Sequence, residues 1–146
     1  MSTAIIYYSK HHGNTKKLLD AIAARYEVTL VDVTAGGDVD LEHFDVIGIA
    51  SGIYYSSYAK PLLEYARNQL PSGKKVFFIS TYGAHREGYY DAIRKVTSEK
   101  NCTEIGTYGC LGYDTFGPFK LVGGLCKGHP DQDEISGAVD FYGSIS

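Results

Sequence analysis

The segment between the first apolar run and the first helical pattern has the residue types of a phosphate cradle. It contains Ser9, Lys10, His11, His12, Gly13, Asn14 and Thr15. Hydroxyl side chains and a glycine let an anion approach closely, and a helix N-terminus adds backbone N–H groups and the positive end of its dipole. The alternative is a plain turn in which Asn14 or Thr15 only caps the helix. Neither a G-x-G-x-x-G nor a G-x-x-x-x-G-K-[ST] motif is present, so a phosphate here would belong to a smaller ligand.

Two further segments combine tyrosine with small residues, and each follows an apolar run. The first contains Ser51, Gly52, Ile53, Tyr54, Tyr55, Ser56, Ser57 and Tyr58. The second contains Thr81, Tyr82, Gly83, Ala84, His85 and Arg86. A tyrosine offers a flat face to a planar ring, although simple burial or sheet propensity explains many of the 13 tyrosines equally well. Together with the cradle, these segments indicate a phosphorylated ligand with a planar ring.

The elements that must position these segments alternate along the chain. The pattern predicts strands over residues 4–8, 28–33, 46–50, 75–80 and 103–111. It predicts helices over residues 14–26, 58–70, 88–100 and 131–142, a short helical turn over 40–44 and a long glycine-rich loop over 112–128. Pro61 suits the first turn of its helix, Pro71 ends that helix, and Pro130 precedes the last one. Strands that alternate with helices indicate βαβ units and a parallel sheet.

The predicted fold class is α/β: a three-layer sandwich around a five-stranded parallel sheet with strand order 2-1-3-4-5. Right-handed crossovers leave few topologies, and this order places ligands beyond the carboxyl ends of the strands, at the switch between the first and third. All three chemically distinctive segments follow such strand ends. The 146 residues suit one domain over 1–146, with no internal repeat or linker.

Composition excludes several classes of function. The balance of 14 Lys+Arg against 17 Asp+Glu gives a net charge of −3, which argues against nucleic-acid binding. We expect no membrane span and a cytoplasmic location, because no signal peptide pattern and no apolar run near ~20 residues occurs. The three cysteines, Cys102, Cys110 and Cys126, form no C-x-x-C and are expected to be reduced. Cys126 and His129 share an i, i+3 spacing but lack further nearby ligands, so no metal site is predicted.

The chain resembles the flavodoxin family and its flavodoxin-domain relatives. The similarity lies in Tyr8-Ser9 through Gly13-Asn14-Thr15, in residues 48–55 and in residues 80–83, and with the strand pattern it covers nearly the whole chain. It implies bound FMN, with the phosphate at residues 9–15 and the isoalloxazine ring between the two tyrosine segments. The cofactor-binding residues implied are Ser9, Lys10, His11, His12, Gly13, Asn14, Thr15, Ser51, Gly52, Ile53, Tyr54, Tyr55, Thr81, Tyr82 and Gly83. Residues 112–119 and 127–130 look like a less characterised branch, and residues 47–58 also resemble flavodoxin-type protoporphyrinogen oxidases.

The sequence departs from the flavodoxin pattern in three places. Three residues rather than two separate Ser9 from Gly13, and the two histidines among them either donate to the phosphate or are solvated. No glycine follows Tyr54 or Tyr55, and a non-glycine residue at positive φ costs ~1–2 kcal/mol, which would weaken stabilisation of a semiquinone. His85 and Arg86 precede the first acidic residue of the third segment. If they face the ring rather than water, they make the flavin potential less negative than in an acidic flavodoxin.

The resemblance implies an electron carrier, for which FMN supplies the chemistry and no catalytic residue is needed. Redox partner proteins, a donor and an acceptor, would dock on the first tyrosine segment and residues 112–119, and we expect a monomer or a weak dimer. The alternative is an FMN-dependent oxidoreductase acting on a quinone, a nitro compound or a porphyrinogen-like substrate, although 146 residues leave no large substrate-binding insertion. A receiver domain would need an aspartate where Ala50-Ser51 stands.

Overall fold

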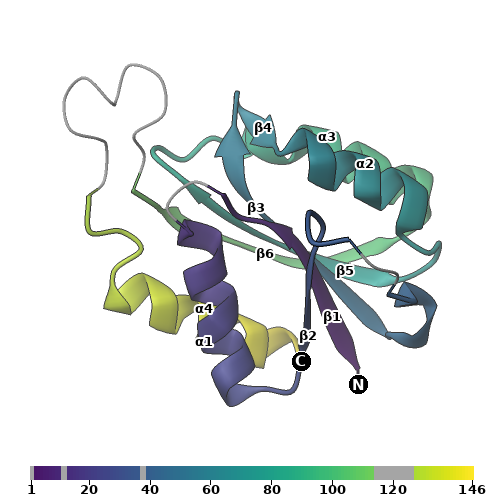
Figure 1. Ribbon diagram of the computed structural model, residues 1–146, viewed down its shortest axis with the longest axis horizontal. Helices are drawn as coiled ribbons and strands as arrows, with labels where there is room; N and C mark the ends of the chain where they lie inside the picture. Colours follow the sequence, from purple (N-terminus) through teal and green to yellow (C-terminus); the bar gives the residue numbers. More distant parts are fainter. Residues whose placement is uncertain (1, 11–12, 37–38, 114–126) are drawn as a thin grey trace.

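A computed structural model describes residues 2–10, 13–36, 39–113 and 127–146 as a three-layer α/β fold, with a parallel sheet between two pairs of helices (Figure 1). The strands are β1 (Thr3–Tyr8), β2 (Thr29–Asp32), β3 (Val46–Tyr54), β4 (Ser57–Tyr58), β5 (Lys75–Tyr82) and β6 (Thr103–Leu111). The α-helices are α1 (Asn14–Arg25), α2 (Lys60–Gln69), α3 (Asp91–Glu99) and α4 (Gln132–Ile145). Short 3-10 helices are η1 (Leu41–His43) and η2 (Glu87–Tyr90).

The strand order β2-β1-β3-β5-β6 confirms the predicted topology, since β5 and β6 are the fourth and fifth predicted strands. All neighbours along this path are parallel, so their carboxyl ends share one edge of the sheet. The order reverses direction between β1 and β3, and this is where a doubly wound sheet opens a crevice for a ligand.

The prediction that the third strand ends at residue 50 and that no strand follows before the next helix is wrong. The strand β3 continues to Tyr54, and β4 pairs antiparallel with it through Ile53 and Tyr58. Tyr55 and Ser56 form the two-residue turn, with φ of 51° and 63°. Two-residue hairpin turns with positive φ at both positions usually contain Asn or Gly, so the sequence carried no signal for this hairpin.

Side chains alternate between two cores, one on each face of the sheet. Ile6, Ile49 and Phe78 are fully buried in the core under α2 and α3. Ile5 and Phe77 are fully buried in the core under α1 and α4. Figure 1 shows these two helix pairs on opposite sides of the sheet. Burial on both faces explains why the central strands are apolar throughout.

The termini of the helices fix the loops at the carboxyl edge. Helix α2 begins at Lys60 rather than at the predicted Tyr58, with proline in its first turn as expected. Asp131 caps α4 through a capping box. The Asp131 side chain accepts from the Glu134 backbone N–H, and the Glu134 side chain accepts from the Asp131 backbone N–H. Among the described residues, no helix has both the length and the apolarity that crossing a bilayer requires.

Candidate cofactor site

A pocket lies at the carboxyl ends of β1, β3, β5 and β6. It is lined by Ser9, Asn14, Thr15, Gly52, Ile53, Tyr54, Thr81, Tyr82, Gly83, Gly112 and Tyr113. The first nine of these residues belong to the set that the sequence predicted. The three predicted segments therefore meet at one edge of the sheet, around one cavity.

The N-terminus of α1 forms the floor at one end of this pocket. Gly13 precedes the helix with φ of 64°, a conformation that glycine adopts at little cost. The Ser9 hydroxyl accepts from the Lys16 backbone N–H at 3.1 Å, and the Gly13 carbonyl accepts from Lys17 N–H at 3.1 Å. The first backbone N–H groups of a helix have no acceptor within it, and Asn14 and Thr15, which carry them here, both line the pocket. This end of the pocket suits an anion.

The side chains of Asn14 and Thr15 do not cap the helix, so the alternative prediction of a plain capped turn is wrong. The Asn14 amide Nδ2 donates to the Tyr113 carbonyl at 2.8 Å, and the Thr15 and Thr81 hydroxyls are 2.8 Å apart. Asn14 Oδ1 is buried and has no hydrogen-bond partner among the described residues. A buried acceptor without a donor costs about 1–3 kcal/mol, which favours a ligand that donates to it.

Two tyrosines stand at the other end of the pocket, at the carboxyl ends of β3 and β5. The Tyr54 ring packs edge-on against Tyr8, with centroids 5.5 Å apart, and its hydroxyl is 3.4 Å from the Lys10 backbone N–H. The Tyr82 ring lies 5.4 Å from His85, and burial raises the pKa of the Tyr82 phenol to about 12. Tyr82 therefore stays neutral at physiological pH. Two uncharged aromatic side chains suit a planar ring.

The remaining wall of the pocket is formed by Gly112 and Tyr113, directly after β6, and is supported by the start of α4. Gly112 N–H donates to the Tyr82 carbonyl at 2.9 Å, and Tyr113 N–H donates to the His129 carbonyl at 2.7 Å. Glu134 Oε2 accepts from Leu111 N–H at 3.0 Å. Sequence reasoning did not include Gly112 or Tyr113 among the site residues. The available signal was a glycine directly after a parallel strand, at the same edge as the other segments.

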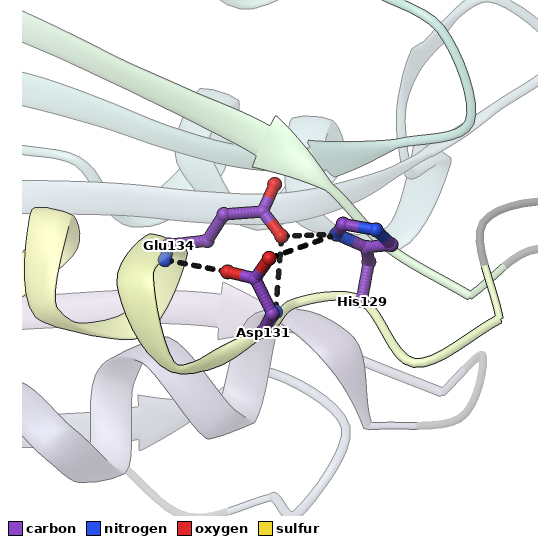
Figure 2. Close-up of side chains that lie close together, drawn as sticks. All are labelled: His129, Asp131 and Glu134. Atoms are coloured by element: carbon purple, nitrogen blue, oxygen red, sulfur yellow. Dashed lines mark hydrogen bonds and ion pairs between the residues drawn. The ribbon is translucent and has the colours of Figure 1, made fainter.

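Figure 2 shows how His129 and Asp131 converge on Glu134 at the start of α4. Glu134 Oε1 contacts His129 Nδ1 and accepts from Asp131 N–H at 3.0 Å, and Asp131 Oδ1 accepts from Glu134 N–H at 2.9 Å. The hydrogen bond that His129 donates to the Glu134 carboxylate raises the pKa of His129. Possible metal-ligating atoms of the three residues lie within 4.8 Å of one another, but both Glu134 oxygens already accept backbone N–H groups. The arrangement is a capping box that holds the pocket wall.

The sequence model of the flavodoxin domain matches residues 5–119. The chain belongs to the flavodoxin domain family. It is 33% identical over 147 residues to an uncharacterized protein of Methanocaldococcus jannaschii, with 99% of this chain and 98% of that protein covered. The fold is similar to a flavodoxin from the domain Archaea, with a TM-score of 0.69, 17% identity and 98% of each chain covered. A flavoprotein in complex with FMN from Lactobacillus acidophilus aligns with a TM-score of 0.58 and 20% identity, over 74% of this chain and 92% of that one.

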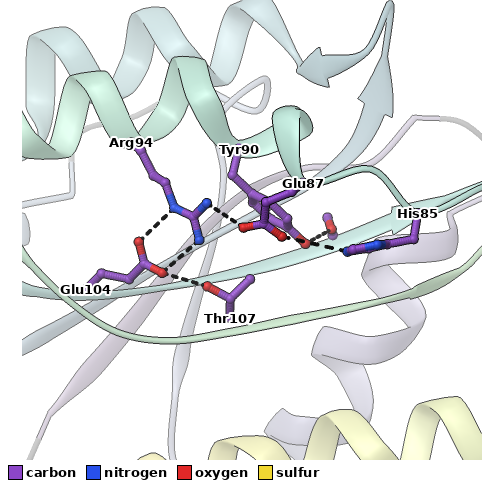
Figure 3. A network of polar contacts seen from close by, with 7 residues as sticks. His85, Glu87, Tyr90, Arg94, Glu104 and Thr107 are labelled. Carbon is purple, nitrogen blue, oxygen red and sulfur yellow. Dashed lines mark hydrogen bonds and ion pairs between the residues drawn. The ribbon is translucent and has the colours of Figure 1, made fainter.

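An ion-pair network anchors the loop that follows β5 in this flavodoxin domain (Figure 3). Arg94 binds both oxygens of Glu104, at 2.9 and 3.0 Å, and Glu87 at 2.7 Å. These bonds raise the pKa of Arg94, and its guanidinium lowers the pKa of Glu104. His85 Nε2 lies 3.9 Å from Glu87, and neither His85 nor Arg86 lines the pocket. The loop is thus held from its outer side by α3 and β6.

Several predicted site residues of the flavodoxin domain lie off the pocket. Ser51 is fully buried, donates to the Gly52 carbonyl at 2.5 Å and accepts from Ala59 N–H at 3.1 Å, so it fixes the hairpin. Lys10 and Gly13 flank the cradle without lining the cavity, and the Tyr55 side chain is 86% exposed. His11, His12 and Cys126 lie outside the described residues. Cys102 and Cys110 are free, and burial raises the pKa of the Cys110 thiol to about 12, which keeps it protonated.

Proposed function

We propose that this flavodoxin domain binds FMN in the pocket and carries electrons between partner proteins. The observation that carries the proposal is the buried and unpartnered Oδ1 of Asn14, the first residue of α1, which lines one pocket together with Tyr54 and Tyr82. The FMN complex of the Lactobacillus acidophilus flavoprotein, which shares the fold, supports this cofactor. When bound, FMN supplies the redox chemistry, and the protein supplies binding and tuning.

Each end of the pocket matches one part of FMN. The backbone amides at the start of α1 and the hydroxyls of Ser9 and Thr15 would hold the phosphate. Asn14 Oδ1 would accept from a hydroxyl of the ribityl chain, which removes the cost of its burial. Tyr54 and Tyr82 would flank the isoalloxazine ring. No other part of the described chain gathers an anion site, an orphaned acceptor and aromatic walls in this way.

The electrostatics of the pocket support a flavin potential less negative than that of an acidic flavodoxin. None of the described residues that line the pocket is charged. Glu87, the first acidic residue after β5, binds Arg94 and does not line the pocket. Negative charge beside a flavin disfavours its anionic reduced form, so its absence from the lining favours reduction. Potentiometric titration of the FMN-loaded protein measures this, and a strongly negative second couple contradicts it.

Titration of the flavin-free protein with FMN, followed by quenching of flavin fluorescence, tests the cofactor. We expect FMN to bind about 100-fold more tightly than riboflavin, because charge-assisted hydrogen bonds to the phosphate contribute about 3 kcal/mol. Asn14→Ala should weaken FMN binding about tenfold, whereas Asn68→Ala, on the exposed surface of α2, should not change it. Equal affinity for FMN and riboflavin, or no binding of either, rejects the proposal.

One observation favours the alternative of an FMN-dependent oxidoreductase. A mostly apolar groove adjoins the pocket and shares Tyr54 with it. A quinone or a nitro compound could enter such a groove without a large insertion in the chain. Steady oxidation of NADH with a soluble quinone, catalysed by the FMN-loaded protein alone, supports the oxidoreductase. Electron transfer that requires an added protein acceptor supports the carrier.

A further inference from the structure

We propose that Thr81 is a positioning residue of the cofactor site, which donates its hydroxyl proton to Thr15 and thereby turns the Thr15 proton toward the phosphate of FMN. This role rests on the proposed function, because it concerns how the same pocket holds the phosphate. Three observations support it: the burial of the two hydroxyls, the number of protons they carry, and the cavity that both residues line.

The hydroxyls of Thr15 and Thr81 form a buried pair between helix and sheet. Thr15 is the second residue of α1, Thr81 is the second-last residue of β5, and their Oγ1 atoms lie 2.8 Å apart. The two residues are 1% and 3% exposed, and both line the pocket. Neither hydroxyl has another hydrogen-bond partner among the described residues. Further hydrogen bonds of the pair are therefore available to a ligand in the pocket.

The number of protons in this pair determines what it can bind. Each threonine hydroxyl has one proton and two lone pairs, so the bond within the pair leaves one proton for a third group. Either hydroxyl can be the donor within the pair. A phosphate monoester has a charge of about −1.5 to −2 at pH 7 and accepts hydrogen bonds. Thr15 lies at the α1 N-terminus, which suits this anion, so Thr15 donates to the phosphate and Thr81 donates to Thr15.

The stability of the fold does not explain why this pair is polar. Two buried hydroxyls that bond to each other add little net stability, because two apolar side chains of the same shape are nearly as favourable. Ile79, which precedes Thr81 on the same face of β5, is apolar and fully buried. The neighbouring Ser80 hydroxyl is also bonded, to the Tyr90 hydroxyl, but neither of these two residues lines the pocket. Its place at the cavity distinguishes the pair of Thr15 and Thr81.

The sheet fixes Thr81 more firmly than the helix fixes Thr15. At Thr81, β5 pairs with both of its neighbours, with Gly52 of β3 and with Cys110 of β6. The χ1 angle of a β-branched side chain is stiff, whereas threonine in a helix divides between two rotamers. The bond from Thr81 therefore selects one rotamer of Thr15. Its donated proton also makes Thr15 a stronger donor, because hydrogen bonds in a chain polarise one another.

A double-mutant cycle on FMN binding tests this role. Thr15→Val removes the donor itself and should weaken FMN binding about 20-fold, whereas Thr81→Val should weaken it about fivefold. Because Thr81 acts through Thr15, the double variant Thr15→Val/Thr81→Val should bind FMN no more weakly than Thr15→Val alone. Riboflavin, which lacks the phosphate, should bind these variants and the unmodified protein equally. Thr81→Ser keeps the hydroxyl and should restore FMN binding to within about twofold.

The matched control is Thr3→Val. Thr3 is a buried threonine at the amino end of β1, and its hydroxyl accepts from the Tyr142 hydroxyl at 2.9 Å. Thr3→Val leaves the Tyr142 hydroxyl without its acceptor, so it should lower the urea midpoint and leave the affinities for FMN and riboflavin unchanged. The double variant at residues 15 and 81 removes both partners, so its urea midpoint should stay near that of the unmodified protein.

Three results would overturn the positioning role. Losses that add in the double variant mean that Thr81 holds the phosphate independently of Thr15. Equal losses for FMN and riboflavin mean that the pair only supports the fold of the pocket. An unchanged FMN affinity in Thr81→Val means that Thr15 needs no partner. If the unmodified protein binds FMN no more tightly than riboflavin, the proposed function itself fails, and the positioning role fails with it.

Discussion

The two walls of the cofactor pocket are built in opposite ways. The β3–β4 hairpin is local in sequence, and its turn residues Tyr55 and Ser56 both have positive φ. The wall at Leu111–Tyr113 depends on contacts distant in sequence, above all the bond from Leu111 N–H to Glu134 23 residues further on. The backbone conformation of the hairpin turn lowers the stability of the first wall, whereas hydrogen bonds to the Glu134 carboxylate stabilise the second.

The contrast indicates different roles for the two walls. A residue other than glycine at positive φ costs about 1–2 kcal/mol, so the surroundings must hold the hairpin turn in place. The main contact that does so is buried Tyr58, whose hydroxyl donates to the Ile79 carbonyl at 2.9 Å. Hydrogen bonds to an ionised acceptor contribute about 1.5–3 kcal/mol each. We therefore expect the hairpin to adjust when a ligand or partner binds, and the β6–α4 wall to stay fixed.

Removal of the Glu134 carboxylate should have the largest effect. Glu134→Ala leaves the N–H groups of Leu111 and Asp131 without their acceptor and breaks the capping box, so the free energy of unfolding should fall by about 3 kcal/mol. Urea denaturation followed by far-ultraviolet circular dichroism measures it. The control Asp133→Ala removes an exposed acid from the same helix turn and should cost less than about 1 kcal/mol. Equal losses in both variants would mean that Glu134 acts only through the helix dipole.

A methyl group at Gly112 should disturb the same wall from inside the pocket. A Cβ there would lie 2.8 Å from Asn14 Nδ2 and 3.1 Å from Thr81 Cβ. Gly112→Ala therefore displaces the Asn14 amide from the Tyr113 carbonyl, and we expect a loss of about 2 kcal/mol in stability together with weaker FMN binding. At Gly88 the nearest atom would be 3.6 Å away, so Gly88→Ala should be close to neutral in both assays. If Gly112→Ala binds FMN as tightly as the unmodified protein, Asn14 does not contribute to FMN binding.

The same contrast explains what the sequence could predict. Apolar runs with helices between them predicted the central strands β1, β3 and β5, because burial on both faces requires such runs. The edge strands β2 and β6 were also predicted, although most of their residues are not buried. The cradle and the tyrosine segments were predictable because parallel strands end at a common edge. Helix α4 was predictable from Pro130 and the acidic residues after it.

The missed features depend on information that local sequence does not carry. Tyr55 and Ser56 adopt a turn for which their residue types have no preference, so β4 was not predicted. Gly112 and Tyr113 reach the pocket because Asn14 and Glu134 bind the segment 111–113, and neither contact leaves a periodic pattern. The sequence left open whether His85 and Arg86 face the ring or water, because the direction of a side chain depends on partners such as Glu87.

The cost of the hairpin turn should be recoverable. Ser56→Gly relieves a serine at φ 63°, so the free energy of unfolding should rise by about 1 kcal/mol. The control Ser57→Gly lies in β4, where the backbone is extended, and should instead lower stability by about 0.5–1 kcal/mol through added chain entropy. Urea midpoints of the two variants give the comparison. If Ser56→Gly also destabilises the protein, the turn is not strained and the two walls do not differ in the cost of their backbone conformation.

The smallest effect concerns pH and the β6–α4 wall. The contact with Glu134 raises the pKa of His129 above its ordinary value of 6.5, with a smaller contribution from Asp131, whose Oδ2 lies 3.7 Å from the ring. A group whose pKa is higher in the folded than in the unfolded state stabilises the fold fully below the unfolded value, and this stabilisation is lost as the pH rises through the folded value. The urea midpoint should therefore decline slightly as the pH rises above 6.5, and His129→Gln should abolish that decline. His43→Gln, at an exposed site on η1, should keep it. If the urea midpoint of His129→Gln still declines above pH 6.5, another group causes the pH dependence. The β6–α4 wall then depends only on the Glu134 carboxylate and the backbone N–H groups that donate to it.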